Sequence, residues 1–208
     1  MKKGPEIIHD EDELGFDAID KEVKEFIERV YGSYTAFQNA VWSDVRTARE
    51  LLKSDDNQFA RRTFLRSFFS AVDGILFALR TIVFEFSKNE TDSPVPNTFT
   101  DGERMLLQER SYELEDNGTV KVRNQNFQPF LKVLRFTFNV YSKLRRNEYL
   151  PDYSGAGWLS FRKATEIRHR ITHPKSPEDL EISSEELLEI ESAVKWFTES
   201  LNFMFSRI

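Results

Sequence analysis

The stretch Gln58–Lys88, QFARRTFLRSFFSAVDGILFALRTIVFEFSK, decides the fold that this sequence predicts. Its apolar residues recur at steps of three and four, which is the spacing of one face of an α-helix. This main stripe consists of Phe64, Phe68, Val72, Ile75, Leu79, Ile82 and Phe86. A stripe of this length needs other helices to cover it. We therefore expect an all-α protein, built as an antiparallel helical bundle around this helix.

A second row of residues runs along roughly the opposite side of the same helix. It consists of Arg62, Arg66, Phe69, Asp73, Phe77, Arg80 and Phe84. Charged side chains alternating with phenylalanines indicate a face that is covered by another helix or by a second subunit. Two interpretations remain open. The charges form a row of internal salt bridges, or Asp73 lies near Arg168 and holds its guanidinium in position.

The residues before this helix are expected to form two shorter helices and a tail. The segment 34–52 is amphipathic, with apolar residues at alternating steps of three and four. The segment 17–30 resembles a short helix, and Gly32-Ser33 is expected to interrupt the chain between the two. Residues 1–16 are acidic and without a period, so we expect a flexible tail before a single domain over 17–208.

A small β-hairpin is expected over about 111–124. Its residues alternate around Asn117-Gly118, and this dipeptide between strand-like runs is a strong hairpin signal. Directly before it, Thr100 and Glu103 have the spacing of a capping box that opens a short helix, ending near Glu109. The hairpin is either a structural flap or a wing that binds nucleic acid.

Three further helices are expected in the remainder of the chain. The first begins at Pro129, which suits the first turn of a helix, and ends near Asn147. The second covers Trp158–Thr172. The third follows the capping residues at Ser183 and ends near Ser206.

Composition excludes several classes of protein and site. There are no cysteines, which excludes disulfides and thiolate metal sites. The most apolar stretch, Thr63–Phe86, carries two arginines and two acids, so no membrane span is expected and a cytoplasmic location is the default. The net charge is −6. Residues 31–177, however, hold 22 basic and 17 acidic residues between two acidic ends, which allows a local anion site.

The stretch RHRITHP, Arg168 to Pro174, is the candidate site. On a helical wheel, Arg168 falls inside the apolar stripe of the segment 158–172, where a charge is costly unless it is paired or functional. His173 precedes a proline, so we expect the helix to end near Thr172. The dipole at a helix C-terminus favours an imidazolium there. A guanidinium and an imidazole would thus lie at one helix end, each suited to a phosphate.

This arrangement resembles the signature of the HEPN superfamily (higher eukaryotes and prokaryotes nucleotide-binding domains): an arginine, a polar residue and a later histidine near the end of a helical domain. Arg168, His169 and His173 match the signature, and the resemblance covers about residues 34–208. It implies an HEPN-like helical bundle and a metal-independent ribonuclease that acts as a homodimer. It also implies a role as a toxin or in defence against phage, with an antitoxin or other protein as partner.

The chemistry of these side chains fits RNA cleavage without a metal or other cofactor. Histidine titrates near neutrality, so His173 suits proton transfer. Arginine stays charged and offers a planar fork of donors, so Arg168 suits the phosphoryl oxygens. His169 would orient the site or contact phosphate, with Asp73 in support. The candidate RNA contacts are Arg170, which lies on the solvent side of the wheel, together with Arg66 and Lys175.

Alternative interpretations stay open beside catalysis. Arg168 could pair with an acid such as Asp73 while His173 only caps the helix. The chain would then be an HEPN module that binds a nucleotide or a protein partner, or a helical scaffold without a ligand. His169 and His173 are four residues apart and could face a metal together. The glutamate of the zinc metalloprotease motif is missing, however, because Arg170 follows His169. We therefore expect no metal site.

Overall fold

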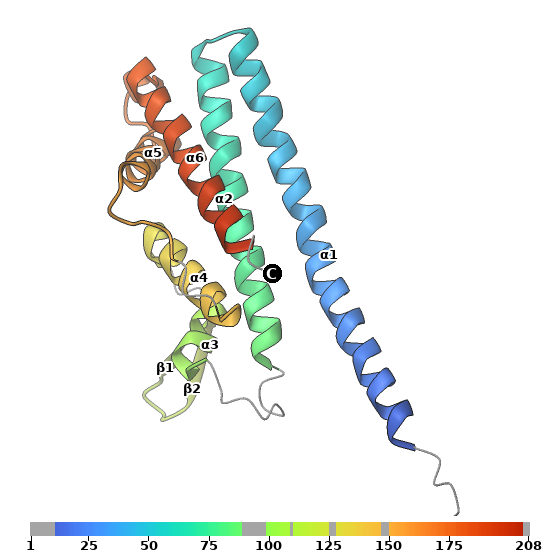
Figure 1. Cartoon of the computed structure of the whole chain (residues 1–208). Helices are drawn as coiled ribbons and strands as arrows, with labels where there is room; N and C mark the ends of the chain where they lie inside the picture. Colours follow the sequence, from blue (N-terminus) through green and yellow to red (C-terminus); the bar gives the residue numbers. More distant parts are fainter. Residues whose placement is uncertain (1–10, 89–98, 109, 125–127, 147–149, 206–208) are drawn as a thin grey trace, which may run out of the picture.

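The computed structural model describes residues 11–88, 99–108, 110–124, 128–146 and 150–205. Helices make up most of these residues, so the all-α prediction is confirmed. Two long helices form an antiparallel pair in Figure 1: α1, Glu11–Ser54, and α2, Gln58–Lys88. The bounds of α2 are those that the sequence predicted.

The N-terminal part of the chain differs from the expectation in two ways. Helix α1 is continuous, so the predicted break at Gly32-Ser33 is wrong. A single glycine inside a helix costs only about 1 kcal/mol relative to alanine, which the rest of a long helix can offset. The helix also begins at Glu11, inside the segment 1–16 that was expected to be a tail. Acidic residues in a first turn favour helix formation. Residues 1–10 lie outside the described residues.

Helix α2 lies at the centre of the core. From Phe64 to Ile82 every residue of its predicted apolar stripe is buried, and Phe86 is partly buried. The ring of Phe68 packs edge-on against Phe161 of α5, Ala156–Thr172, and against Phe197 of α6, Ser184–Phe205. These aromatic contacts fix the position of the helix that carries the candidate motif.

The helices around α2 do not form a simple antiparallel bundle. Helix α6 runs in the same direction as α2, and α5 is seen nearly end-on in Figure 1, so it crosses both. The connection between α5 and α6 explains this arrangement. It contains a short 3-10 helix, Pro177–Leu180, and returns to the first turn of α2, where Gln58 and Arg61 both donate to the carbonyl of Ile182.

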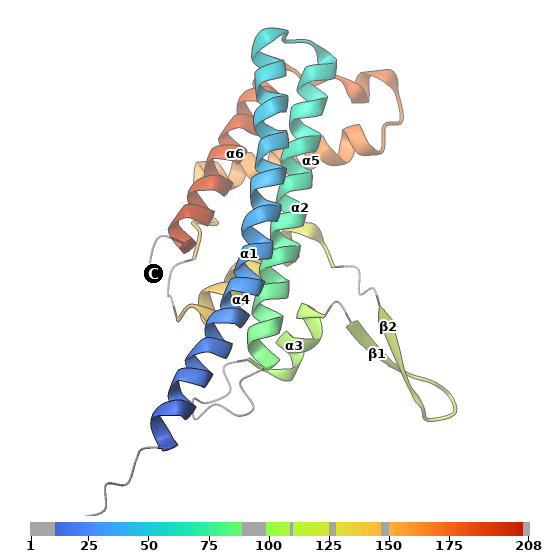
Figure 2. The ribbon, with the colours of Figure 1, turned by 90° about the vertical axis from the view of Figure 1, so that its right-hand side faces the viewer.

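The segments between α2 and α5 form a smaller group beside the lower half of α2, as Figure 2 shows. Helix α3, Asp101–Leu107, starts with the predicted capping box of Thr100 and Glu103. The strands β1, Arg110–Leu114, and β2, Val120–Asn124, pair in antiparallel register and occupy the segment where the hairpin was expected. Helix α4, Phe130–Leu144, packs on α2 and ends three residues earlier than expected.

Helix α2 is, among the described residues, the one helix that is long and apolar enough to cross a membrane. More than half of its most apolar window, 56%, is buried inside the fold. This is the burial pattern of a core helix that is covered by its neighbours.

Candidate functional site

The motif helix α5 ends as the sequence predicts. Thr172 is its last helical residue, and His173 has left the helical conformation, with φ −127° and ψ 58°. The backbone N–H of His173 still donates to the carbonyl of His169 at 3.0 Å. The hydroxyl of Thr172 donates to the carbonyl of Arg168 at 2.7 Å. These bonds fix the last turn, which carries all three motif residues.

The Arg168 guanidinium contacts Asp73 of α2, as one of the two open interpretations anticipated. The Arg168 Nη2 atom lies 2.6 Å from Asp73 Oδ2. The guanidinium carbon also lies over two aromatic rings, 5.1 Å from the centroid of Phe69 and 5.3 Å from that of Phe130. An ion pair and two cation–π contacts together restrict the planar group to one orientation.

The pair of Arg168 and Asp73 is not sealed in the core. The Arg168 side chain is 32% exposed and that of Asp73 is 45% exposed. Partial burial of Asp73 is the larger influence and raises the pKa of its carboxyl, whereas the neighbouring charge of Arg168 acts to lower that pKa. The guanidinium is thus held by one carboxylate oxygen and still accessible to a ligand.

The imidazoles of His169 and His173 lie next to each other. Their ring centroids are 5.1 Å apart, and both residues are exposed. Within the described ranges, no group of three or more histidine, aspartate or glutamate residues has the geometry to hold a metal ion. The two rings thus lie side by side near the fixed guanidinium of Arg168.

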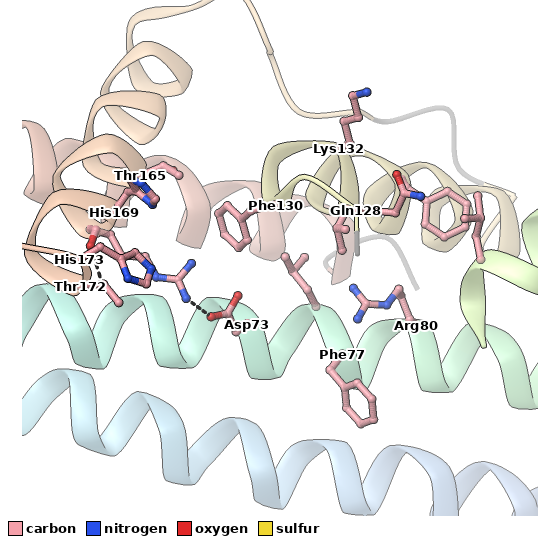
Figure 3. A pocket seen from close by; sticks show the side chains of 15 residues that line it. Asp73, Phe77, Arg80, Gln128, Phe130, Lys132, Thr165, His169, Thr172 and His173 are labelled. Atoms are coloured by element: carbon pink, nitrogen blue, oxygen red, sulfur yellow. Dashed lines mark hydrogen bonds and ion pairs between the residues drawn. The ribbon is translucent and has the colours of Figure 1, made fainter. Parts of the chain in front are cut away.

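These side chains border a cleft of about 970 Å³ between α2, α4 and the end of α5. Figure 3 shows His169, His173 and Thr172 at one end of the cleft, Asp73 near the middle and Arg80 toward the other end. The Arg80 guanidinium points back toward Asp73. The lining also includes Leu76, Phe77, Leu106, Gln128, Phe130, Lys132, Val133, Phe136, Thr165 and Arg168.

Arg170 is not the free, solvent-facing cation that the helical wheel indicated, and its role as an RNA contact stays a prediction. Its Nη2 atom lies 2.8 Å from both carboxylate oxygens of Glu186, at the start of α6. Glu186 also accepts the backbone N–H of Ser183, which completes the predicted cap of α6. Arg170 therefore joins α5 to α6 on the side away from the cleft. A helical wheel of α5 alone could not reveal this partner, which comes from a later helix.

The other two candidate RNA contacts lie outside the cleft lining. Arg66 and Lys175 are both exposed, and neither borders the cleft. The backbone N–H of Lys175 donates to Asp179 at 2.8 Å, which fixes the turn after the motif. Their roles as RNA contacts stay predictions.

Several residues of the cleft were not singled out from the sequence. Gln128 lies just before α4, Lys132 is in the first turn of α4, and Thr165 comes from α5. Only Arg80 had a signal, because it is in the same mixed row of α2 as Asp73, seven residues later. The packing of α4 against α2 brings the other residues to the site, and no local pattern encodes that packing.

Comparison with known proteins gives no relative: no family model, no curated protein and no solved structure matches this chain.

Proposed function

We propose that this protein is a metal-independent RNA endonuclease of the HEPN type. The observation that carries the proposal is the placement of Arg168, which is oriented by Asp73 at 2.6 Å, beside the paired imidazoles of His169 and His173 in one cleft. A fixed cation and neutral-range proton-transfer groups are what metal-free phosphodiester cleavage needs. The role as a toxin or in phage defence comes with the family resemblance.

The proposed reaction uses the substrate's own 2'-hydroxyl as nucleophile. A neutral imidazole takes the proton of that hydroxyl, whose oxygen bonds to phosphorus. The bond from phosphorus to the 5'-oxygen breaks, and an imidazolium donates a proton to that oxygen. Arg168 balances the charge on the phosphoryl oxygens. The products are a 2',3'-cyclic phosphate and a free 5'-hydroxyl.

His173 is the proposed acid/base, and the homodimer supplies a second one. A two-fold axis would bring two copies of Arg168 and His173 to one composite site. His169 then orients the phosphate. The proposed partners are the second copy, the RNA, and an antitoxin or other protein that controls the activity.

The test is cleavage of labelled single-stranded RNA in EDTA. The wild-type protein should produce cyclic-phosphate ends, and His173→Ala should lower the rate by about 10²- to 10⁴-fold. Arg168→Ala should lower it by a similar factor. Lys195→Ala is the matched control: it removes an exposed charge of α6 that is paired with Glu199, and should cleave as the wild type does. Circular dichroism and light scattering establish that all variants keep their fold and assembly.

Equal cleavage by the wild type and by folded His173→Ala would assign the activity to a contaminant and overturn the proposal. The second candidate function would then take its place, an HEPN module that binds a nucleotide without cleaving it. The size of the cleft favours that candidate, because about 970 Å³ exceeds what a single phosphate fills. Saturable binding of a mononucleotide without any RNA cleavage would identify it.

A further inference from the structure

The cleft extends well beyond the motif that the proposed function uses. Asp73 and Arg80 are seven residues apart on α2, which corresponds to about 10 Å along the helix axis. The motif side chains occupy one end, and Arg80 and Gln128 border the other, while the Lys132 ammonium points away from the cleft in Figure 3. A site for a single phosphate would need only the first end.

The lining between these two ends is largely apolar. Leu76 and Val133 contribute aliphatic side chains, and Phe130 and Phe136 contribute aromatic rings. Leu106 of α3 also borders the cleft and is 39% exposed. An apolar surface between two polar ends matches a ligand whose flat, weakly polar part lies between charged groups.

The charges of the cleft lining indicate that the charged groups of such a ligand are negative. Arg80, Lys132 and Arg168 are cationic, and Asp73 is the one acidic side chain among the residues named for this cleft. Arg80 is only 8% exposed and has interactions of its own within the fold, so its charge is held in place rather than free to move. The cleft thus has a positive balance in a protein whose net charge is −6.

We infer that the apolar part of the cleft is a subsite for one nucleobase of single-stranded RNA, next to the phosphate that Arg168 holds. The inference rests on the proposed function and names its substrate class. The base lies against the apolar lining, and the phosphate on its far side is placed toward Arg80. A paired and stacked base of a duplex cannot reach such a surface, so the subsite selects unpaired RNA.

The test uses oligonucleotides that can be cleaved at one place only. An oligodeoxynucleotide with a single ribonucleotide has one 2'-hydroxyl and hence one scissile phosphate. One version lacks the base on the 5' side of that phosphate, a second lacks the base on the 3' side, and a third lacks a base far along the strand. Loss of base stacking should lower kcat/KM by about 5- to 150-fold for one of the first two. The third should be cleaved as the intact strand is.

A pair of matched variants tests the same surface from the protein side. Leu106→Glu places an anion in the lining of the cleft. Leu159→Glu makes the same change at a leucine of α5 that is 50% exposed and outside the cleft lining. Leu106→Glu should raise the Kd for an all-deoxy strand at least tenfold, and Leu159→Glu should leave that Kd unchanged. Both leucines are exposed, so neither variant should unfold.

The outcomes separate this inference from the proposed function. Cleavage that is insensitive to both neighbouring bases and to Leu106→Glu overturns the base subsite alone. Base-dependent binding of the all-deoxy strand without any cleavage of the chimeric strands supports the subsite and overturns the nuclease. Failure to bind any strand overturns both. A protein partner would be the occupant of this surface instead if an apolar peptide competes with the strand for binding and removal of a base has no effect on binding or cleavage.

Discussion

The Arg168 guanidinium on α5 donates to the Asp73 carboxylate on α2 at 2.6 Å, across 95 residues of sequence. Arg168 interrupts the apolar stripe of α5, and Asp73 belongs to the mixed row of α2; the two residues meet where these helices cross. The contact orients the guanidinium along the cleft, while a third of its side chain stays accessible. In the proposed nuclease Asp73 is therefore a positioning residue, and its effect on catalysis should be separable from its effect on stability.

The first prediction concerns Asp73→Asn. The pair is too exposed to contribute much to stability, so the free energy of unfolding should change by less than about 1 kcal/mol. The rate of RNA cleavage should fall by about tenfold to 10²-fold, because Arg168 loses the partner that fixes its orientation. Urea unfolding and cleavage in EDTA measure the two effects. A loss of stability without any loss of kcat would make the contact purely structural.

A second prediction follows from the raised pKa of Asp73. Because partial burial raises this pKa above its ordinary value of 3.8, the folded protein binds the proton more tightly than the unfolded chain does. The resulting stabilisation is complete below the ordinary pKa and is lost as the pH rises through the raised one. The Asp73→Asn variant has no ionisable side chain at this position and therefore serves as the reference.

The stability of the wild type relative to Asp73→Asn should therefore decrease as the pH rises through the acid range toward neutrality. Denaturant unfolding of both proteins, at several values of pH across that range, measures the difference. A difference that grows with pH would mean that Arg168 dominates over burial and lowers the pKa instead.

Features of the structure that depend on interactions between residues close in the sequence could be predicted, and most features that depend on distant segments could not. The bounds of α2, the end of α5 at Thr172 and the capping box at Thr100 rest on local periodicity and local hydrogen bonds, and all three are confirmed. The break expected at Gly32-Ser33 is wrong, because one glycine is a weak signal against a long helix.

Contacts between distant segments were predictable only where a residue broke a pattern. Arg168 is a charge on an otherwise apolar face, and Asp73 lies in a row of charges and phenylalanines, so each indicated a partner. Arg170 shows the opposite case: its position on the outer side of α5 fitted solvent, and nothing in the local sequence indicated that Glu186 would pack beside it. The same holds for Lys132 and Gln128, which reach the cleft only through the packing of α4.

A third prediction separates Arg170 from the RNA site. Because Arg170 is bonded to both carboxylate oxygens of Glu186, Arg170→Ala should lower the free energy of unfolding by about 1 kcal/mol. The affinity for RNA and its salt dependence should not change. Fluorescence anisotropy over a salt titration measures both. A flatter salt dependence in Arg170→Ala would restore the original interpretation of this residue as an RNA contact.

A fourth prediction compares two glycines at helix crossings. A methyl group on Gly157 of α5 would lie 2.8–3.0 Å from atoms of Trp196, including its Cβ, which cannot move without the backbone of α6. Gly157→Ala should therefore lower the free energy of unfolding by about 1–3 kcal/mol through overpacking. It should also disturb the motif helix.

Gly74→Ala is the matched variant. Its methyl group would meet only the outer ring atoms of Phe37, and this side chain is 40% exposed and able to swing aside. Replacing glycine by alanine inside a helix contributes up to about 1 kcal/mol, which offsets that movement. Thermal unfolding of the two variants should give a clearly lower Tm for Gly157→Ala, and equal values would contradict this account of the α5–α6 contact.

The last prediction asks where the second proton-transfer group comes from. The homodimer proposal takes it from His173 of a second copy, whereas the structure also places His169 next to His173 in the same chain, at 5.1 Å between ring centroids. Mixing the wild type with His173→Ala, after subunit exchange, distinguishes the two sources. If one site needs both copies of His173, mixed dimers are inactive, and an equal mixture retains about one quarter of the wild-type activity per total protein. If each chain has a complete site, the same mixture retains about one half of the wild-type activity.

We expect one quarter, with His169→Ala lowering the rate less than His173→Ala does. A value of one half, together with a severe loss in His169→Ala, would assign both proton transfers to neighbouring turns of a single α5.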